Sequence, residues 1–403
     1  MLNPEEQDMD LILELEESMI IEPPEPQAWL GDPLLNQEIE HGRYRVEQAL
    51  GWGGFSTVYE VRRTLTGQPR AMKVLHRDFA DDDEARARFI HEASLLDQLD
   101  HPNIVRYFDA GVLEQTRQPF MLMEKLVGQS LHDALWATGE ATLPTPEDAV
   151  LIGIQIASAL AHAHGKGVLH RDLKPENIFL IGSEGGERPP RVKLIDFGIS
   201  SPLNAQLSPE EAMLGTPQYV APEQFEERTT FDARLDIYQL GAVLHVMLTG
   251  HTPHPDGDDN FVKVYASQLT YADGPGPRPS RLQPELERYI GLDALVARML
   301  SNDRELRPMT ARDALEALQH CLKVDFEAIV TDRLGEPVCG YEDTSQASDL
   351  LKRLPLPPAT SASPRSARHV GAVELTLDPS RERPSWRQRL KELAALSLRG
   401  SWA

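Results

Sequence analysis

The chain has 403 residues, a formal net charge of −23 and two cysteines. Its length allows one large or two ordinary hydrophobic cores, its acidity argues against general nucleic-acid binding, and two cysteines give no disulfide framework. No signal peptide is evident, and no uncharged apolar run reaches the roughly 20 residues that span a bilayer. We therefore expect a cytoplasmic protein without an integral membrane anchor.

The first 43 residues form an acidic N-terminal extension. Residues 1–40 carry twelve Asp or Glu and no Lys or Arg. The run from Asp10 to Ile21 fits an amphipathic helix only loosely, and Glu22–Pro26 predicts an extended linker. One interpretation is a flexible tail that adds solubility, and the other is a docking or autoinhibitory segment. The apolar side chains behind the second interpretation are Leu11, Ile12, Leu15, Met19 and Ile20.

Short strands are predicted over residues 44 to about 122, at Tyr44–Leu50, Thr57–Arg63 and Arg70–Leu75. The first two flank the turn Gly51-Trp52-Gly53-Gly54-Phe55-Ser56. Glycines let a backbone pass close to phosphate oxygens and present N–H groups to them. A glycine turn alone more often marks an ordinary hairpin, but its short distance to Lys73 favours a phosphate site.

Lys73 lies in an apolar strand, where an unpaired ammonium is costly to bury, so it needs an anion or a route to the surface. The next segment, 82–100, is predicted to be helical because apolar residues recur there at helical spacing. Glu92 is the only carboxylate between Ala85 and Leu96.

Helical patterns dominate from Leu131 onward. The segment Leu235–Thr249 is apolar nearly all round, as expected for a central buried helix. The other predicted helices are Ala149–His164, Leu292–Leu300 and Ala311–Leu322.

Two polar loops follow short apolar runs in this half of the chain. The first is His170-Arg171-Asp172-Leu173-Lys174-Pro175-Glu176-Asn177, and the second is Asp196-Phe197-Gly198. Together they offer two carboxylates, an ammonium and a side-chain amide. A site that aligns a hydroxyl, hard metal ions and a polyphosphate needs these groups.

These motifs resemble the eukaryotic-type serine/threonine protein kinases, especially the bacterial members, over roughly residues 44–320. The resemblance implies a two-lobed α+β fold, with a small β-rich N-lobe and a larger helical C-lobe, in a domain spanning 44–322. It also implies transfer of the γ-phosphoryl group of ATP to Ser or Thr hydroxyls of protein substrates, with autophosphorylation, in signalling. The expected metal is Mg²⁺, with Mn²⁺ as an alternative.

The resemblance assigns catalytic and metal-binding roles to four residues of the polar loops. Asp172 orients the substrate hydroxyl and accepts its proton, and Lys174 meets the γ-phosphate. A lysine at this position marks serine/threonine kinases rather than tyrosine kinases. Asn177 and Asp196 ligate the metal.

The resemblance also implies a nucleotide site in the strand-rich half. Lys73 contacts the α- and β-phosphates and pairs with Glu92. The family has a third glycine where this chain has Ser56, and Gly51 and Gly53 remain. The implied nucleotide-binding residues are Leu50, Gly51, Gly53, Val58, Ala71, Lys73, the gatekeeper Met123, and the hinge residues Glu124 and Leu126.

The segment from Gly215 to Glu223 resembles the substrate-docking end of a kinase activation segment. Thr216 is implied to contact the catalytic aspartate and lysine, and Glu223 to pair with Arg307. Asp236 is implied to hold the backbone of the first polar loop, residues 170–177, which is called the catalytic loop from here on.

A phosphate on the activation segment would satisfy Arg171. The candidate acceptors are Ser200, Ser201, Ser208 and Thr216. Ser208 followed by Pro209 is also a helix start, and we favour the cap over a phosphosite. Glu210 or Glu211 is a possible substitute anion.

Residues 323–403 form a C-terminal extension. Leu354–Ser366 is rich in Pro, Ser and Ala and is predicted to be a linker. Trp386–Leu398 is predicted to be a short basic amphipathic helix, which either packs as a terminal helix or binds a partner or membrane surface. Pairing between the acidic head and this basic tail is a further hypothesis.

Two other functions compete with an active protein kinase. A pseudokinase or scaffold would usually lack the lysine, the catalytic aspartate or the metal aspartate, and all three are present. A small-molecule kinase is disfavoured because the docking segment is a protein-substrate feature.

Overall fold

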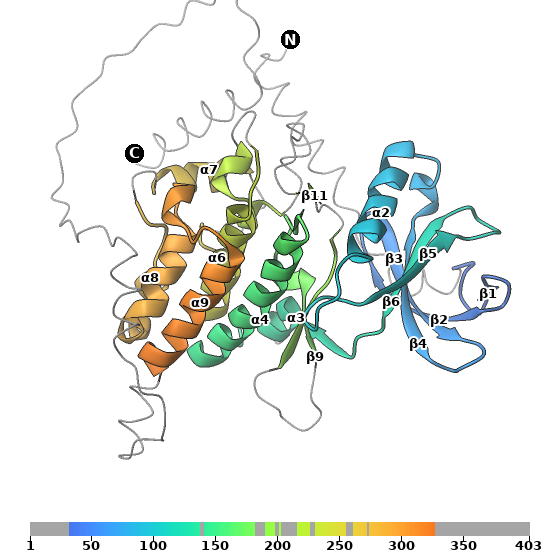
Figure 1. The fold of residues 1–403 in the computed structure, drawn as a ribbon, viewed down its shortest axis with the longest axis horizontal. Helices are drawn as coiled ribbons and strands as arrows, with labels where there is room; N and C mark the ends of the chain where they lie inside the picture. Colours follow the sequence, from blue (N-terminus) through green and yellow to red (C-terminus); the bar gives the residue numbers. More distant parts are fainter. Residues whose placement is uncertain are drawn as a thin grey trace, which may run out of the picture.

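The computed structural model describes residues 32–137, 141–181, 190–197, 201–202, 216–225, 230–254, 261–271 and 274–326. A small strand-rich lobe lies beside a larger helical lobe (Figure 1). This arrangement confirms the predicted two-lobed α+β fold.

The small lobe is built on a six-stranded antiparallel sheet in the order β1-β2-β3-β4-β6-β5. One face packs a core that includes Val46, Val61 and Met72. The helix α2 packs against β5 and β6, and the side chain of Asp82 caps its first turn. The elements are β1 (Glu38–Ile39), β2 (Tyr44–Trp52), β3 (Ser56–Arg63), β4 (Pro69–Leu75), α2 (Asp83–Leu96), β5 (Tyr107–Val112) and β6 (Pro119–Glu124).

Residues 32–43, upstream of the predicted boundary at residue 44, pack against this lobe. The strand β1 pairs with β2, and Leu34 and Ile39 are buried in the core of the sheet. The hydroxyl of Tyr59 donates to Oδ2 of Asp32 at 2.6 Å. A strand of two residues is too short to show a hydrophobic period, so the sequence pattern could not reveal it.

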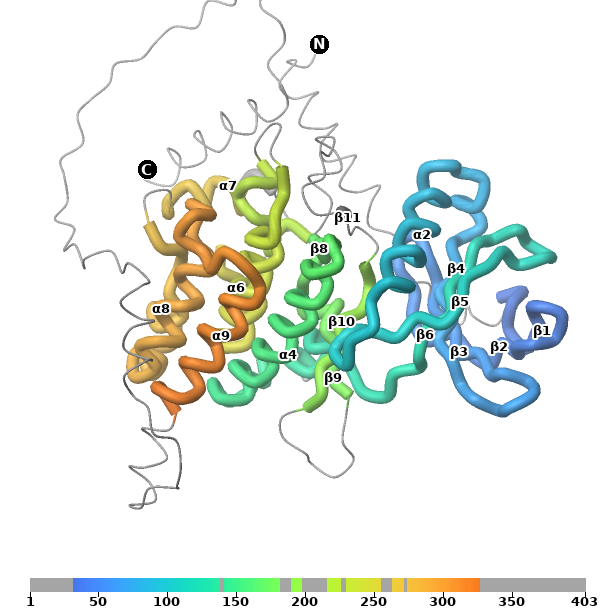
Figure 2. The backbone as a smooth tube through the Cα atoms, viewed as in Figure 1, coloured from blue at the N-terminus to red at the C-terminus, as the bar shows by residue number. Residues whose placement is uncertain are grey.

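The large lobe packs its helices around α6, whose residues are all buried. The helix α4 contacts α6 and α9, and α6 also contacts α8. Figure 2 traces the backbone through these helices. The four helices predicted within this lobe, Ala149–His164, Leu235–Thr249, Leu292–Leu300 and Ala311–Leu322, have counterparts in α4, α6, α8 and α9. The helices are α3 (Leu131–Trp136), α4 (Pro146–Gly165), α6 (Arg234–Thr249), α7 (Phe261–Leu269), α8 (Ile290–Met299) and α9 (Ala311–Cys321).

The remaining described elements are short strands and turns. The strands are β7 (Gly128–Ser130), β8 (Val168–Leu169), β9 (Ile178–Ile181), β10 (Arg191–Leu194) and β11 (Ser201–Pro202). Short 3₁₀ turns lie at Arg77–Phe79, Pro175–Asn177, Pro217–Tyr219, Pro222–Phe225, Pro279–Arg281, Pro284–Arg288 and Arg304–Leu306, and a π turn at Leu322–Phe326.

Two close contacts fix the helices of the large lobe. A Cβ atom on Gly241 of α6 would lie 2.6 Å from Cβ of Met299 on α8, so this crossing needs glycine. The carboxylate of Asp325 accepts the backbone N–H groups of Gly291 and Leu292, at 3.2 and 2.8 Å, and so caps α8 from a distant turn. Within the described residues, none of these helices combines the length and the apolar character that a membrane crossing requires.

Candidate active site

Lys73 contacts two carboxylates at once. It lies on β4 directly opposite Val58 of β3, and its Nζ atom is 2.9 Å from Oε1 of Glu92 and 2.9 Å from Oδ1 of Asp196. Burial opposes the charge of Lys73, but the two carboxylates outweigh it and the pKa of the lysine is raised. Burial also raises the pKa of Glu92, and the Lys73 ammonium opposes that rise. The lysine therefore joins β4, α2 and the loop after β10.

Asp196 is held in an uncommon backbone conformation, with φ of 60°. Such a conformation costs about 1–3 kcal/mol and persists only where the surroundings impose it. Here it accompanies the contact with Lys73, whose charge lowers the pKa of Asp196 to about 2. The side chain is half-exposed and ionised at neutral pH.

The catalytic loop gathers its polar side chains around Asp172. Nδ2 of Asn177 donates to Oδ2 and to the backbone oxygen of Asp172, at 2.9 and 2.8 Å. Nζ of Lys174 lies 3.2 Å from Oδ2 of Asp172 and donates to Oγ1 of Thr216 at 2.8 Å. The structure thus contains the contact between the lysine and the threonine that the family resemblance implies.

The backbone of this loop is hydrogen-bonded to a side chain of α6. Asp236 accepts the N–H groups of His170 and Arg171, at 2.9 and 2.8 Å, as the resemblance implies. Its Oδ2 atom also lies 2.7 Å from Nε2 of His164. Burial would raise the pKa of Asp236, but the hydrogen bond with His164 and the nearby charges lower it overall.

A second side chain of α6, that of Gln239, also forms hydrogen bonds with the backbone of this loop. Sequence reasoning did not predict it. The amide of Gln239 accepts the N–H of Leu173 at 3.1 Å and donates to the oxygen of Arg171 at 2.7 Å. Gln239 lies three residues after Asp236, so both face the same side of the helix. That spacing was the available signal, but an amide in an apolar helix marks no particular function.

The glycine turn between β2 and β3 leaves room beside its backbone. A Cβ atom built on Gly51 or Gly54 would meet nothing within 4 Å. The N–H of Gly53 donates to the oxygen of Ser56 at 2.8 Å and closes the turn. Ser56 itself is the first residue of β3, pairs with Leu75 and is buried. The departure from the family pattern therefore falls on a strand residue, where no glycine is required.

Aromatic contacts hold this turn against the end of β4. The rings of Trp52 and His76 lie 4.0 Å apart, and those of Phe55 and Phe79 lie 4.9 Å apart. The N–H of His76 donates to the oxygen of Phe55 at 2.8 Å. Because Lys73 lies on β4, just before His76, these contacts hold the glycine turn close to the strand that carries the lysine.

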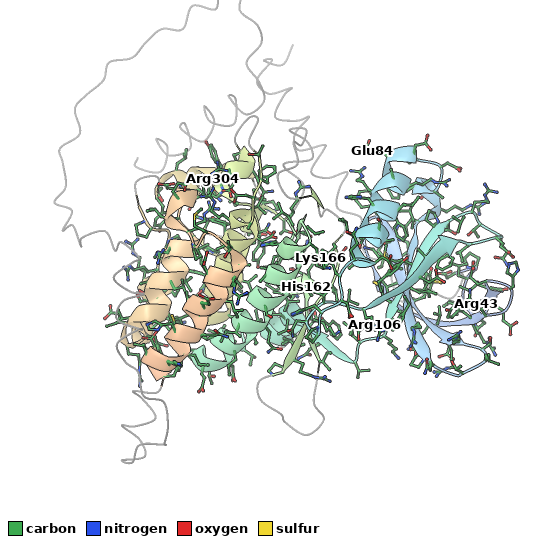
Figure 3. The ribbon with its side chains drawn as sticks, viewed as in Figure 1. Arg43, Glu84, Arg106, His162, Lys166 and Arg304 are labelled. Carbon is green, nitrogen blue, oxygen red and sulfur yellow. The ribbon has the colours of Figure 1, made fainter. Side chains whose placement is uncertain are left out.

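The predicted hinge is tied to both lobes. The carboxylate of Glu124 accepts the N–H of Arg106 at 2.7 Å and pairs with Lys193 of β10. Arg106 is labelled in Figure 3, where the lobes meet. Nζ of Lys125 lies 2.6 Å from Oε2 of the buried Glu60 on β3. Sequence reasoning missed these pairs because their members are far apart in the chain.

The remaining predicted nucleotide residues line the same region. Ala71 and Met123 are cross-strand partners on β4 and β6, and Leu50 is exposed near the glycine turn. Leu126 is half-buried just after the hinge strand. The described residues thus bring the predicted site residues of both lobes to one junction.

Several predictions lie outside the described residues. Ser200, Ser208 and the segments 1–31 and 327–403 are among them. The backbone of Ser201 pairs with Leu169 as part of β11. The regulatory sites, the acidic head and the basic tail therefore stay predictions.

Comparison with known proteins decides the family. A profile described as the protein kinase domain matches residues 44–322. The chain belongs to the protein kinase family. The predicted resemblance to bacterial serine/threonine protein kinases is confirmed by the relatives of this kinase.

Its curated relatives are longer than this kinase. The chain is 37% identical over 284 residues to the serine/threonine-protein kinase pkn2 of Myxococcus xanthus, covering 69% of this chain and 32% of that protein. It is 31% identical over 357 residues to the serine/threonine-protein kinase PrkC of Bacillus subtilis, covering 88% and 51%. The chain therefore spans about half or less of the length of each of these two relatives.

The fold has solved counterparts. The kinase domain of Mycobacterium tuberculosis PknI is 27% identical to this kinase, with a TM-score of 0.53, and the match covers 71% of this chain and 98% of that one.

Proposed function

We propose that this chain is a Mg-ATP-dependent serine/threonine protein kinase. The observation that carries the proposal is the pair of simultaneous contacts from Lys73 to Glu92 and to Asp196. The proposal assigns phosphate binding to Lys73 and metal binding to Asp196, and it is supported by the direct contact between these two side chains. Bacterial relatives named serine/threonine-protein kinases support Ser and Thr as the acceptor residues.

The residues present fit a nucleotide and a hard metal ion. The open space beside Gly51 and Gly54 leaves room for phosphate oxygens near backbone N–H groups. Asp196 and Asn177 offer oxygen ligands, which Mg²⁺ prefers. Among the described residues no group of three His, Cys, Asp or Glu side chains forms a metal cage.

The chain's own side chains account for the transfer step. Asp172 orients the substrate hydroxyl and accepts its proton while the hydroxyl oxygen bonds to the γ-phosphorus of ATP. The bond from that phosphorus to the β–γ bridging oxygen breaks, and ADP leaves. Lys174, hydrogen-bonded to Thr216 and 3.2 Å from Asp172, supplies a positive charge for the γ-phosphoryl oxygens, whose negative charge the transfer redistributes. A bound metal ion would supply further neutralisation of phosphate charge.

A pseudokinase scaffold is the competing function. Pseudokinases usually lack the lysine or one of the two aspartates. This chain has Lys73, Asp172 and Asp196, and Lys73 and Asp196 are in contact. The test is transfer of radiolabelled phosphate from ATP to a basic protein by the full chain, followed by phosphoamino-acid analysis. Asp172→Asn is the matched control. Nucleotide binding without transfer by the unaltered chain would overturn the proposal and leave the scaffold.

A further inference from the structure

A buried polar network lies under the docking loop, which we define as residues 216–225. Val220 and Phe225 of this loop pack on Tyr265 and Ala266 of α7 in a small apolar cluster. Apolar packing alone would let the loop slide, since it has no direction. Hydrogen bonds to its backbone would fix its position.

One chain of hydrogen bonds begins at the backbone of Val220. Nε2 of Gln268, on α7, donates to the oxygen of Val220 at 2.7 Å and to the hydroxyl of Tyr238 at 3.1 Å. That hydroxyl lies 2.7 Å from Nε2 of His254, and Nδ1 of His254 lies 3.2 Å from Oγ of Ser267. Tyr238, His254 and Gln268 are each at most 1% exposed.

The direction of these bonds follows from the chemistry of the groups. The amide nitrogen of Gln268 only donates, so the Tyr238 oxygen accepts from it. Burial lowers the pKa of His254 to about 3, and the imidazole is neutral at physiological pH. A neutral imidazole has one N–H and one acceptor nitrogen, so the tautomer of His254 sets which partner donates in its hydrogen bonds with Tyr238 and Ser267.

The same cluster holds the other end of the loop. Arg307 binds both oxygens of Glu223, at 2.7 and 2.8 Å, and its guanidinium lies 4.9 Å from the ring centre of Tyr238. Asn302 links the two groups of hydrogen bonds. Its Nδ2 donates to the backbone oxygen of Gln268, and its own backbone oxygen accepts from Arg307. Val220 and Glu223 are thus fastened to one buried group of side chains.

We propose that the Tyr238–His254–Gln268 network is a positioning device for protein substrates, which sets the place of the docking loop and so the affinity for the acceptor peptide. The proposal rests on the proposed kinase activity. The network does not touch Lys73, Asp172 or Asp196, so its loss changes peptide binding and spares nucleotide binding.

The test is Tyr238→Phe in the full chain. This change keeps the ring against Arg307 and removes only the hydroxyl. We expect KM for one acceptor peptide to rise about five- to tenfold, the scale of one or two hydrogen bonds, while KM for ATP stays within about twofold. Gln268→Met, which removes the donor to Val220, should give the same split.

Thr249→Val is the matched control. Thr249 also lies on α6, is 2% exposed, and donates its hydroxyl to the oxygen of His245 at 2.7 Å, away from the docking loop. It should lower the melting temperature without moving either KM. If Tyr238→Phe and Gln268→Met leave KM for peptide at the Thr249→Val value, the network is structural only and the inference fails. An unaltered chain that transfers no phosphate at all would instead overturn the proposed function.

Discussion

The ammonium of Lys73 pairs with two carboxylates, those of Glu92 and Asp196. A substitution at Asp196 therefore removes one ion pair, and a substitution at Lys73 removes both. In Asp196→Asn, Lys73 keeps Glu92 at 2.9 Å, so the buried charges stay paired. We expect at least ~100-fold loss of turnover, the scale for a lost charge-stabilising group, with little change in the melting temperature. Turnover and thermal melting measured together check this. An Asp196→Asn protein that melts normally and keeps its turnover would remove the metal role.

Lys73→Met should differ from Asp196→Asn in stability. It leaves the buried Glu92 without its cation, and burial then raises the pKa of that carboxyl further. We expect a similar loss of turnover together with a lower melting temperature. The comparison of the two melting curves is the measurement, and equal curves would contradict the shared-charge geometry.

Ser56 offers a test of the missing glycine. Because Ser56 is a paired and buried residue of β3, Ser56→Gly should destabilise the chain by about 0.5–1 kcal/mol and should not lower KM for ATP. Denaturant unfolding and ATP titration of the rate give both numbers. A tighter KM for ATP in the glycine variant would mean that the turn is impaired as it stands.

Residues of a local motif were predictable, and so were the few long-range contacts that the family resemblance implies, such as Glu223 with Arg307; the other contacts across the fold were not. Asp172 and Asn177 share one loop, and their spacing carries the signal. His164 and Lys193 bind carboxylates on other elements, and nothing beside them in the chain indicates the partner. Their roles follow only from tertiary packing.

At the level of elements, the buried pair between Glu223 and Arg307 fastens the docking loop to the turn before α9. Arg307→Met leaves Glu223 buried without its partner, and such a loss costs about 3–5 kcal/mol. Arg312→Met is the control, since the Arg312–Glu316 pair of α9 is exposed and should contribute less than about 1 kcal/mol. Urea unfolding of both variants measures the contrast. Equal losses would show that burial does not govern these pairs.

The crossing of α6 and α8 depends on one glycine. Alanine in place of glycine usually stabilises a helix by about 1 kcal/mol, but at Gly241 the new methyl would meet Cβ of Met299. We expect Gly241→Ala to destabilise the chain by about 1–3 kcal/mol. At Gly165, where nothing lies within 4 Å, the same change should be neutral or stabilising. Melting curves that rank the two variants the other way would contradict the close crossing.

Periodicity found the long elements and missed the short ones. The predicted helix at Leu235–Thr249 corresponds to α6, which is buried all round. Sequence reasoning did not single out α7 or β1. The helix α7 packs under the docking loop, a tertiary contact that the sequence pattern does not indicate. The strand β1 has two residues, which are too few to show a hydrophobic period.

For the whole molecule, the packing of residues 32–43 decides how the acidic N-terminal extension is tested. Deleting residues 1–40 would remove Leu34 and Ile39 from the core and Asp32 from Tyr59. We expect that deletion to lower the melting temperature by at least about 5 °C, and deletion of residues 1–31 to leave it within about 2 °C. Identical melting of the two truncated chains would place β1 outside the fold.

The shorter deletion then tests regulation by the head. If residues 1–31 compete with substrates for basic docking residues, their removal raises turnover at low salt, and the gain fades as salt screens the charges. Turnover on one peptide at two salt concentrations measures this. Equal rates and equal salt dependence would leave a solubilising tail.

The capping of α8 by Asp325 bears on where this kinase can be cut. A chain ended after Leu322, at the edge of the matched domain, would lose the carboxylate that accepts the N–H groups of Gly291 and Leu292 and would also lose Phe326, whose ring stacks on Tyr289 at 4.8 Å. A chain ended after Phe326 keeps both contacts. The practical border of the domain is therefore four residues beyond Leu322, and a fluorescent label or fusion partner attached there would start from a point anchored on α8.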